Sequence, residues 1–255
     1  MGFFNKFARL TKRINAISLV KSFNCVIRKF STTTHHFQHL VEWGYSPNPE
    51  WYDHFLDQYW GWSKIGTGMP WERGIFSSIA LKKNGKALEL CCGDGFNAYH
   101  FYAIHLESII SVDFDRAAIE HARKNFKNSK IRYEICDIRS SIPIGKFDNV
   151  IWDAAIEHFT ESEINKIMSD IKDRLTDKGI LSGYTITARP DGQKMHHDHE
   201  YEFSSKEDLM RFLSPYFQRV KIFETDYPDR HNLYFYASDR VPLPFDADWN
   251  FSISK

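Results

Sequence analysis

A short apolar segment that runs into two glycines is the feature that most constrains the fold of this chain. The segment 86–90 is mainly apolar, Gly93-Asp94-Gly95 follows closely, and an amphipathic helical pattern begins at Phe96. A buried strand that turns into a helix through glycines places bare backbone at the carboxyl end of a sheet, where α/β proteins bind ligands. Glycine suits this turn because it tolerates positive φ and carries no side chain that would keep a ligand away.

Three further short apolar segments each end at an aspartate, namely Asp113, Asp137 and Asp153. Asp113 lies 18 residues after Gly95, about the spacing at which a nucleotide-binding fold places a carboxylate on ribose hydroxyls. Helical patterns between the segments favour a doubly wound domain. The alternative explanation is that these acids only cap helices or turns.

The downstream pattern extends the same sheet. Residues 161–175 form the clearest amphipathic helix, and Ser204 or Ser205 should cap a second helix that ends at Leu213. Residues 217–223 and 232–237 alternate as strands and would form a hairpin. We therefore predict an α/β fold with a doubly wound, seven-stranded, mostly parallel sheet.

This series of motifs resembles the class I S-adenosylmethionine-dependent methyltransferases, over about residues 84–240. The resemblance implies their Rossmann-like fold and S-adenosylmethionine as the cofactor. It departs from the family at Cys91, which replaces the first glycine of the usual acid-x-Gly-x-Gly-x-Gly run and whose Cβ makes positive φ costly. The matching segments are Leu88–Gly95, Val112–Asp113, Cys136–Ile138, Phe147–Asp153, Ala155–Phe159 and Leu175–Leu181.

The resemblance also implies roles for single residues. Glu89 would hold the cofactor's ammonium, and Asp113 would accept both ribose hydroxyls. Asp137 would accept a hydrogen bond from the adenine amino group, and Phe114 or Ile138 would pack on the adenine face. The complete set of cofactor-binding candidates is Glu89, Cys91, Gly93, Asp94, Gly95, Asp113, Phe114, Asp137, Ile138 and Asp153.

The net charge of the chain is zero, but the charges are unevenly distributed along it. Residues 1–41 contain seven Lys or Arg and no acid, so the rest of the chain has a net charge of −7. An acidic body is a poor match for nucleic acid. The tetrapeptide with which amino-methylating nucleic-acid enzymes hold a planar nitrogen is also missing after Asp153, so we expect no nucleic-acid substrate.

The chain divides into four segments by composition. Residues 1–41 form a basic amphipathic leader, and 42–83 form an aromatic-rich helical cap with five of the seven tryptophans. Residues 84–240 form the cofactor-binding domain, and 241–255 an irregular tail. The leader could lie on an anionic membrane through residues 1–30, act as a cleaved transit peptide, or be a solvated arm. We accordingly expect a cytoplasmic protein that contacts the inner membrane, with a mitochondrial protein as the alternative.

A methyltransferase needs little from its protein beyond alignment and a group that takes a proton from the acceptor. His158 and Glu157 follow the fourth strand. His197 and His199 belong to the cluster His196–Glu200 within a polar insert, residues 188–205. These four residues are the catalytic candidates, with structural roles as the alternative. Three histidines and two acids in five residues could bind a divalent metal, but their spacing fits no zinc signature. We therefore predict no metal ligands and leave the metal dependence of this cluster open. Tyr184 and Tyr201 are further candidates to bind a polar substrate.

Three functions remain open on the sequence. The first is methyl transfer to oxygen, or less favourably nitrogen, of a small or glycan-like substrate, because residues 195–204 resemble a His-x-His-Glu-Phe-Ser/Thr segment of bacterial surface-polysaccharide methyltransferases. The second is a lipid-quinone ring methyltransferase. The third is a partner protein that binds the cofactor without catalysis.

Overall fold

A computed structural model gives the fold, and it describes residues 16–44, 53–228 and 230–247 with five isolated positions before residue 16 (5, 6, 8, 9 and 12). The contacts within the chain divide it into two compact units, with the main boundary between Pro70 and Trp71. Each unit is described by itself. The side chains of Trp43 and Trp51, two of the cap tryptophans, lie outside the described residues, as do residues 248–255 of the tail.

The first unit contains the helices α2 (Ile17–Gly44) and α3 (His54–Trp60) and the π-helical turn η1 (Gly61–Ile65). The polar side of α2 packs on the aromatic side of α3 and η1. The hydroxyls of Thr32 and Tyr59 lie 2.6 Å apart, and the ring of His39 stacks on Trp60 with a centroid distance of 4.4 Å. Aromatic residues of the predicted cap therefore serve, in this unit, to join its helices.

The opposite side of α2 is apolar and exposed. Leu19, Phe23, Val26, Phe30 and Phe37 are each more than 60% exposed and recur at helical spacing. No described helix is long and apolar enough to cross a membrane. The more N-terminal apolar residues of the predicted leader (Phe3, Phe4, Phe7, Leu10 and Ile14) lie outside the described residues.

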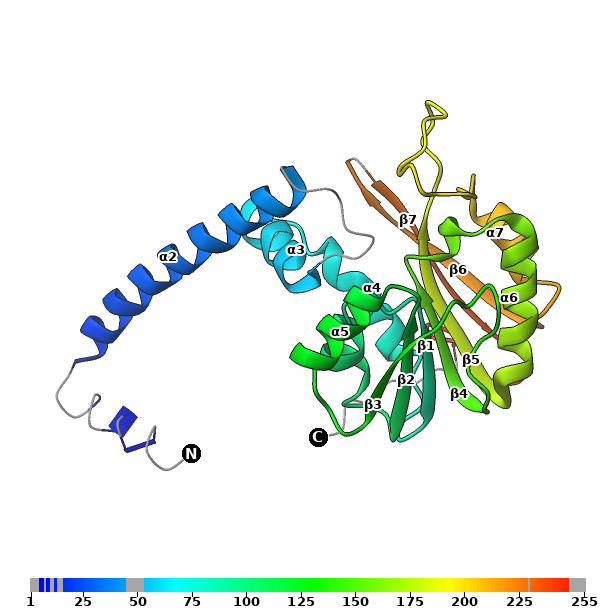
Figure 1. The fold of residues 1–255 in the computed structure, drawn as a ribbon, viewed down its shortest axis with the longest axis horizontal. Coiled ribbons are helices and arrows are strands. Elements are labelled where there is room, and N and C mark those ends of the chain that lie inside the picture. The colour runs from blue at the N-terminus through cyan, green and yellow to red at the C-terminus, as the bar shows by residue number, and fades with distance from the viewer. Residues whose placement is uncertain are drawn as a thin grey trace. The chain divides into compact units, whose positions relative to one another are not determined.

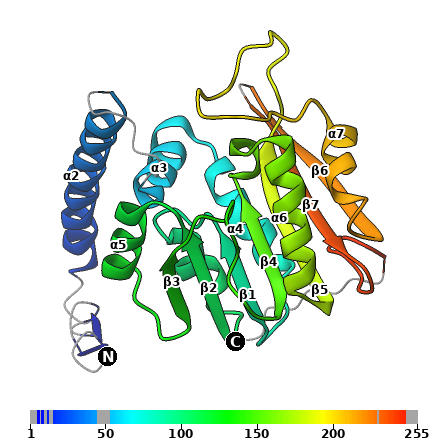
Figure 2. The same ribbon diagram turned by 45° about the vertical axis from the view of Figure 1, so that its right-hand side comes forward.

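The second unit is built on a seven-stranded sheet with the order β3-β2-β1-β4-β5-β7-β6 (Figures 1 and 2). The first five strands are parallel, and β7 pairs antiparallel with both β5 and β6. The predicted doubly wound, mostly parallel sheet is therefore confirmed. Its strands are β1 (Lys86–Leu90), β2 (Ser108–Asp113), β3 (Ile131–Ile135), β4 (Phe147–Asp153), β5 (Leu175–Ile186), β6 (Arg219–Tyr227) and β7 (Arg230–Ser238).

Helices cover both faces of the sheet (Figure 2). Leu88 and Leu90 of β1 face the larger apolar core, which α6 (Glu161–Arg174) and α7 (Lys206–Leu213) close. Ala87 faces the second core, beneath η2 (Ala98–Tyr102) and α5 (Arg116–Asn125), and α4 (Met69–Ile79) packs farther along that face through Phe76. Alternate residues of one strand thus enter two cores, as in a sheet buried on both sides.

Three details differ from the expected pattern. No helix lies between β3 and β4. The connection, residues 136–146, is an irregular loop that contains Pro143 and Gly145, which both disfavour a helix. The helix after Gly95 is a single short turn that ends in the π-helical η2. The predicted alternation of 232–237 is absent, since β7 lies between β5 and β6 and is buried on both faces.

Candidate active site

The carboxyl ends of β1, β2, β3 and β4 meet at one edge of the sheet, because these strands are parallel. The ends of these strands and the loops that follow them carry the cofactor-binding candidates. Two non-glycine residues there, Cys91 after β1 and Ala154 after β4, have positive φ (56° and 52°). Backbone strain of this kind is retained where the surrounding structure over-determines it, often at functional sites.

The loop after β1 follows the conformation that its glycines predict. Gly93 and Gly95 have φ of 53° and 78°. A Cβ at Gly95 would lie 2.7 Å from the ring of Tyr133 and 2.8 Å from Cβ of Ala122, so no other residue fits. Cys91 adopts the positive φ that the usual glycine would adopt more easily.

Asp113 ends β2 and joins it to this loop. Its Oδ2 accepts the backbone N–H of Gly93 (2.9 Å), and its Oδ1 accepts that of Asp115 (2.9 Å). The N-cap of α5 is Asp115 and not Asp113. The bond from the N–H of Asp115 does close a turn at Asp113, so the turn part of the alternative explanation holds beside the contact with the glycine loop. A carboxylate oxygen can accept more than one hydrogen bond, so these contacts are compatible with the predicted ribose contact.

Glu89 is buried near the carboxyl end of β1, a central strand of the sheet. It accepts a hydrogen bond from Ser111, its neighbour on β2 (2.6 Å). Burial raises the pKa of Glu89 to about 8, with Asp153, Asp94 and Asp113 adding to the shift. The raised pKa means that burial disfavours the ionised form of Glu89. A cation bound beside Glu89 would stabilise the ionised form.

The adenine-side candidates lie after β3. Both carboxylate oxygens of Asp137 accept hydrogen bonds from Arg139 (2.8–3.1 Å), which lowers the pKa of Asp137. The guanidinium carbon of Arg139 also lies 5.9 Å from the ring centroid of Phe114. Ile138 is buried in the core, whereas Phe114 is half-exposed and offers an aromatic face. The sequence pattern did not identify Arg139 as the partner of Asp137, because a basic residue two positions from an acid is common.

Asp153 ends β4 and receives hydrogen bonds from two residues that the sequence did not single out. Tyr102 donates to Oδ2 (2.7 Å), and Ser77 donates to both oxygens (3.0 Å). Burial nevertheless raises the pKa of Asp153 to about 6. Both donors face the sheet from helical segments, and only the tertiary structure shows which strand end they reach.

The catalytic candidates after β4 and in the insert come together. Glu157 and His158 lie in η3 (Ile156–His158), and the rings of His158 and His199 meet edge to face with a centroid distance of 4.8 Å. Glu157 and His199 are buried and His158 is exposed. His197 is exposed on the same insert and lies beside Asp198 (3.2 Å).

Several other polar side chains of this region form hydrogen bonds with neighbouring side chains. Glu202 lies 2.6 Å from Nδ1 of His199, and Thr185 donates to Oε2 of Glu157 (2.9 Å). The hydroxyl of Tyr184 donates to Asn232 (3.1 Å), and that of Tyr201 donates to Asp208 (2.9 Å). The two tyrosines predicted as substrate contacts therefore each have a structural partner.

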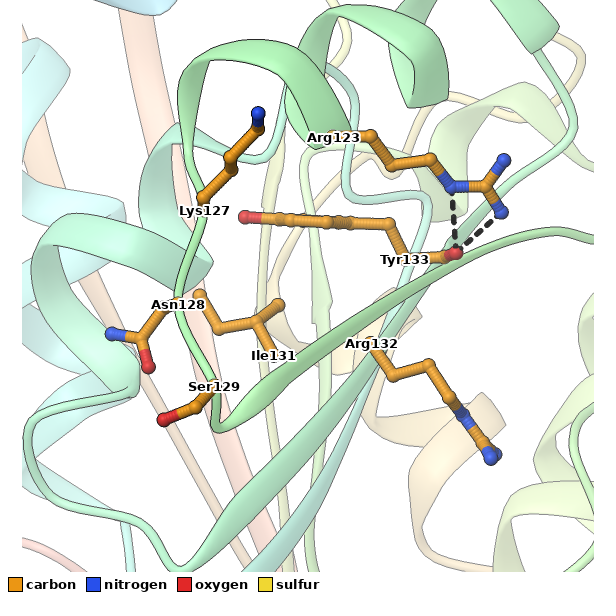
Figure 3. A pocket seen from close by; sticks show the side chains of 7 residues that line it. All are labelled: Arg123, Lys127, Asn128, Ser129, Ile131, Arg132 and Tyr133. Atoms are coloured by element: carbon orange, nitrogen blue, oxygen red, sulfur yellow. Dashed lines mark hydrogen bonds between the residues drawn. The ribbon is translucent and has the colours of Figure 1, made fainter.

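A shallow hollow at the amino end of β3 is unrelated to this site (Figure 3). Its basic residues are Arg123, Lys127 and Arg132. Arg123 donates from Nε and Nη2 to the carbonyl oxygen of Tyr133 (3.1 and 2.6 Å), and Arg132 pairs with Glu134 (2.6 Å). Two of its three cations are thus engaged locally, at the edge of the sheet opposite to the strand ends.

Comparison with known proteins decides the family. A family model described as a methyltransferase domain matches residues 87–179, which hold the glycine loop, Asp113 and β4. This chain carries a class I S-adenosylmethionine-dependent methyltransferase domain. No curated protein matches the sequence significantly.

Solved structures share the fold of this methyltransferase. One is the N-methyltransferase NodS from Bradyrhizobium japonicum WM9 with S-adenosyl-l-homocysteine, with 16% identity and a TM-score of 0.58 over 72% of this chain and 92% of that one. A DhpI–SAH complex has 15% identity and a TM-score of 0.53, over 73% and 96%. The PH0226 protein from Pyrococcus horikoshii OT3 has 16% identity and a TM-score of 0.53, over 74% and 100%.

The residues at the strand ends fit S-adenosylmethionine, the cofactor of this family. The cofactor is cationic at its sulfonium and ammonium, and the site offers the acids Glu89, Asp94, Asp113 and Asp153. In addition, Oδ1 of Asn97, two residues after Gly95, is buried without a hydrogen-bond partner among the described residues. The buried amide oxygen calls for a hydrogen-bond donor, and the buried acids call for positive charge; the ammonium of the cofactor supplies both.

Proposed function

We propose that this methyltransferase methylates an oxygen atom of a small-molecule or glycan-like substrate. The observation that carries the proposal is the cluster of Glu157, His158 and His199 directly after β4, next to the cofactor loops. His158 is the exposed member and would face the acceptor. A hydroxyl needs such a cluster because it must lose a proton when it is methylated.

The chain's own residues would orient the two reactants. Gly93 and Gly95 let the backbone approach the cofactor, Asp113 holds its ribose, and Glu89 holds its ammonium. S-adenosylmethionine supplies an activated methyl group on sulfur, so alignment and proton removal are the protein's tasks. The acceptor oxygen gains the methyl group as the carbon–sulfur bond breaks, and its proton leaves through the cluster.

The acceptor class is supported by the sequence and by charge. The insert resembles a segment of surface-polysaccharide methyltransferases, and the acidic body disfavours polyanions. One structural neighbour is named an N-methyltransferase, which keeps nitrogen as the second candidate for the acceptor atom. A lipid quinone would be a different acceptor class, and a partner protein that binds the cofactor without catalysis would be a different function.

Isothermal titration with S-adenosylmethionine, followed by a methyl-release assay on fractionated extracts, tests the proposal. We expect binding of one equivalent, and turnover on a glycan-containing or small polar fraction. Turnover only on an isoprenoid-lipid fraction would favour the quinone as acceptor. Binding without turnover on any fraction would support the non-catalytic role, and no binding would overturn the proposal.

We also propose that α2 binds an anionic membrane surface, which would place the enzyme beside the inner membrane. The support is its exposed apolar face, formed by Leu19, Phe23, Val26 and Phe30, within residues 17–41, which contain no acid. The full chain should sediment with vesicles containing phosphatidylglycerol, and F23E/F30E should not. Equal sedimentation of both proteins would exclude this role, as would import and cleavage of the leader in mitochondria.

A further inference from the structure

We propose that Glu157, His158 and His199 bind one divalent metal ion, which in turn holds the acceptor oxygen. This inference rests on the proposed function and gives it a mechanism. One ligand atom from each of the three side chains lies within 4.8 Å of the others. Two imidazoles and one carboxylate are a ligand set for first-row divalent metals such as Mn²⁺, Co²⁺, Fe²⁺ or Zn²⁺.

The backbone holds the two halves of this site together. Glu157 and His158 follow β4, whereas His199 belongs to the insert about forty residues later. The carbonyl oxygen of Glu157 accepts the N–H groups of Glu200 (2.9 Å) and Tyr201 (3.1 Å). The insert is thus pinned to η3 directly beside His199, and the separation in sequence explains why no metal signature was visible there.

The hydrogen bonds of both histidines direct a lone pair to Nε2. Nδ1 of His158 lies 3.3 Å from the carbonyl oxygen of Asp198, which can only accept, so Nδ1 carries the proton. Nδ1 of His199 lies 2.6 Å from Oε1 of Glu202, and both side chains are more than 90% buried. A carboxylate that orients a histidine through its second nitrogen is the usual support of a metal-binding imidazole.

Glu157 supplies the negative charge. Its side chain is 3% exposed, and Oε2 accepts a hydrogen bond from Thr185 (2.9 Å), a neutral donor. Buried carboxylates are normally paired or coordinate a metal. A divalent cation between Glu157 and the two neutral rings would satisfy this requirement.

A second group of possible ligands, His196, His197 and Asp198, lies on the same insert. His197 and Asp198 are exposed, and Nδ1 of His196 accepts the backbone N–H of Asp198 (3.3 Å). No buried carboxylate orients these rings among the hydrogen bonds of the described residues. The buried group around His199 is therefore the better site, and His197 provides a matched control.

The proposed ion would lie at the methyl-transfer end of the cofactor site. Leu90 of β1 pairs with Trp152 of β4, so the glycine loop and η3 leave adjacent strands. Burial is the main cause of the raised pKa of the Cys91 thiol, and the charges of Asp113 and Glu157 add to it. An open coordination position there would bind the acceptor hydroxyl and lower its pKa, as metal ions do for bound water. The cluster would then promote proton loss through the metal, and the proton itself would pass to solvent water.

Titration of the chelator-treated full chain with CoCl₂, followed by visible absorption, tests metal binding. We expect one equivalent to bind, with at least tenfold weaker binding for H158A and E157Q. H158A changes an exposed side chain, so its loss of binding cannot come from a disturbed core. E202Q should bind about 10- to 100-fold more weakly, and H197A within about twofold of the parent.

Three results would overturn part or all of this inference. Loss of Co²⁺ binding in H197A but not in H158A would assign the metal to the exposed group. No binding of Co²⁺ by a parent protein that still binds S-adenosylhomocysteine would overturn the metal site and leave the methyltransferase intact. Failure to bind S-adenosylhomocysteine would instead overturn the proposed function.

Proton NMR tests the position of the ion. Bound Mn²⁺ should broaden the S-methyl signal of S-adenosylmethionine in the ternary complex with the parent protein, and H158A should abolish the broadening. Bound Mn²⁺ that leaves this signal sharp would show that the ion lies away from the transferred methyl group, and would overturn its role with the acceptor.

Discussion

Oδ2 of Asp113 accepts the backbone N–H of Gly93 at 2.9 Å and so joins the end of β2 to the loop that follows β1. The carboxylate that would hold the ribose therefore also holds the glycine loop in place. If Asp113 holds the ribose as we predict, cofactor binding and loop geometry depend on the same side chain.

Replacement of Asp113 by Ala should weaken binding of S-adenosylmethionine about 10- to 100-fold, because hydrogen bonds to charged groups are worth about 1.5–3 kcal/mol. Isothermal titration measures the loss. D115N is the control, since Asn caps a helix as well as Asp and α5 keeps its N-cap. Equal affinity of D113A and the parent would refute the ribose role.

The cofactor-free protein should lose stability as the pH rises from about 4.5 to about 8. Burial raises the pKa of Glu89 to about 8, so the folded state binds a proton that the unfolded state has released in this range. The slope should approach 1.4 kcal/mol per pH unit. Urea denaturation should show a flatter profile for E89Q, and identical profiles would show that Glu89 is not the titrating group.

Tyr102→Phe should destabilise the protein in a pH-dependent manner. Tyr102 donates to Asp153, whose pKa is about 6 because of burial, and the bond favours the carboxylate form. We expect a loss of about 1.5–3 kcal/mol in the free energy of unfolding at pH 8, and a smaller loss at pH 5. Y99F, at an exposed position of the same turn, should change little. A loss that is the same at both pH values would contradict this role.

Gly95→Ala should lower the free energy of unfolding by about 2–5 kcal/mol. About 1–2 kcal/mol comes from positive φ, and the rest from overlap with Tyr133 and Ala122. Gly192→Ala is the control, because Gly192 also has positive φ but nothing lies within 4 Å of its added Cβ. Chemical denaturation should separate the two, and equal losses would show that the contacts at Gly95 are unimportant.

The fold was largely predictable because it depends on local patterns. The apolar run before Gly93, the acid at Asp113 and the capped helix before Leu213 each signal their structure within a few residues. The connection between β3 and β4 was not predictable as a loop, because a crossover can be helical or irregular at that length. The burial of β7 on both faces depends on its neighbours and not on its own sequence.

The site shows the same division. Sequence reasoning found Glu157, His158 and His199 as separate candidates, but it had no means to place them in contact.

The sequence by itself determined the strand–glycine–helix series and with it the sheet and the cofactor, since backbone conformation and apolar periodicity act over short stretches of chain. Only the tertiary structure decided which polar groups meet. Arg139 reaches Asp137, Tyr102 reaches Asp153, and the insert brings His199 and Glu202 to η3. Such contacts arise where parallel strands end side by side, and their geometry depends on how the connecting segments pack.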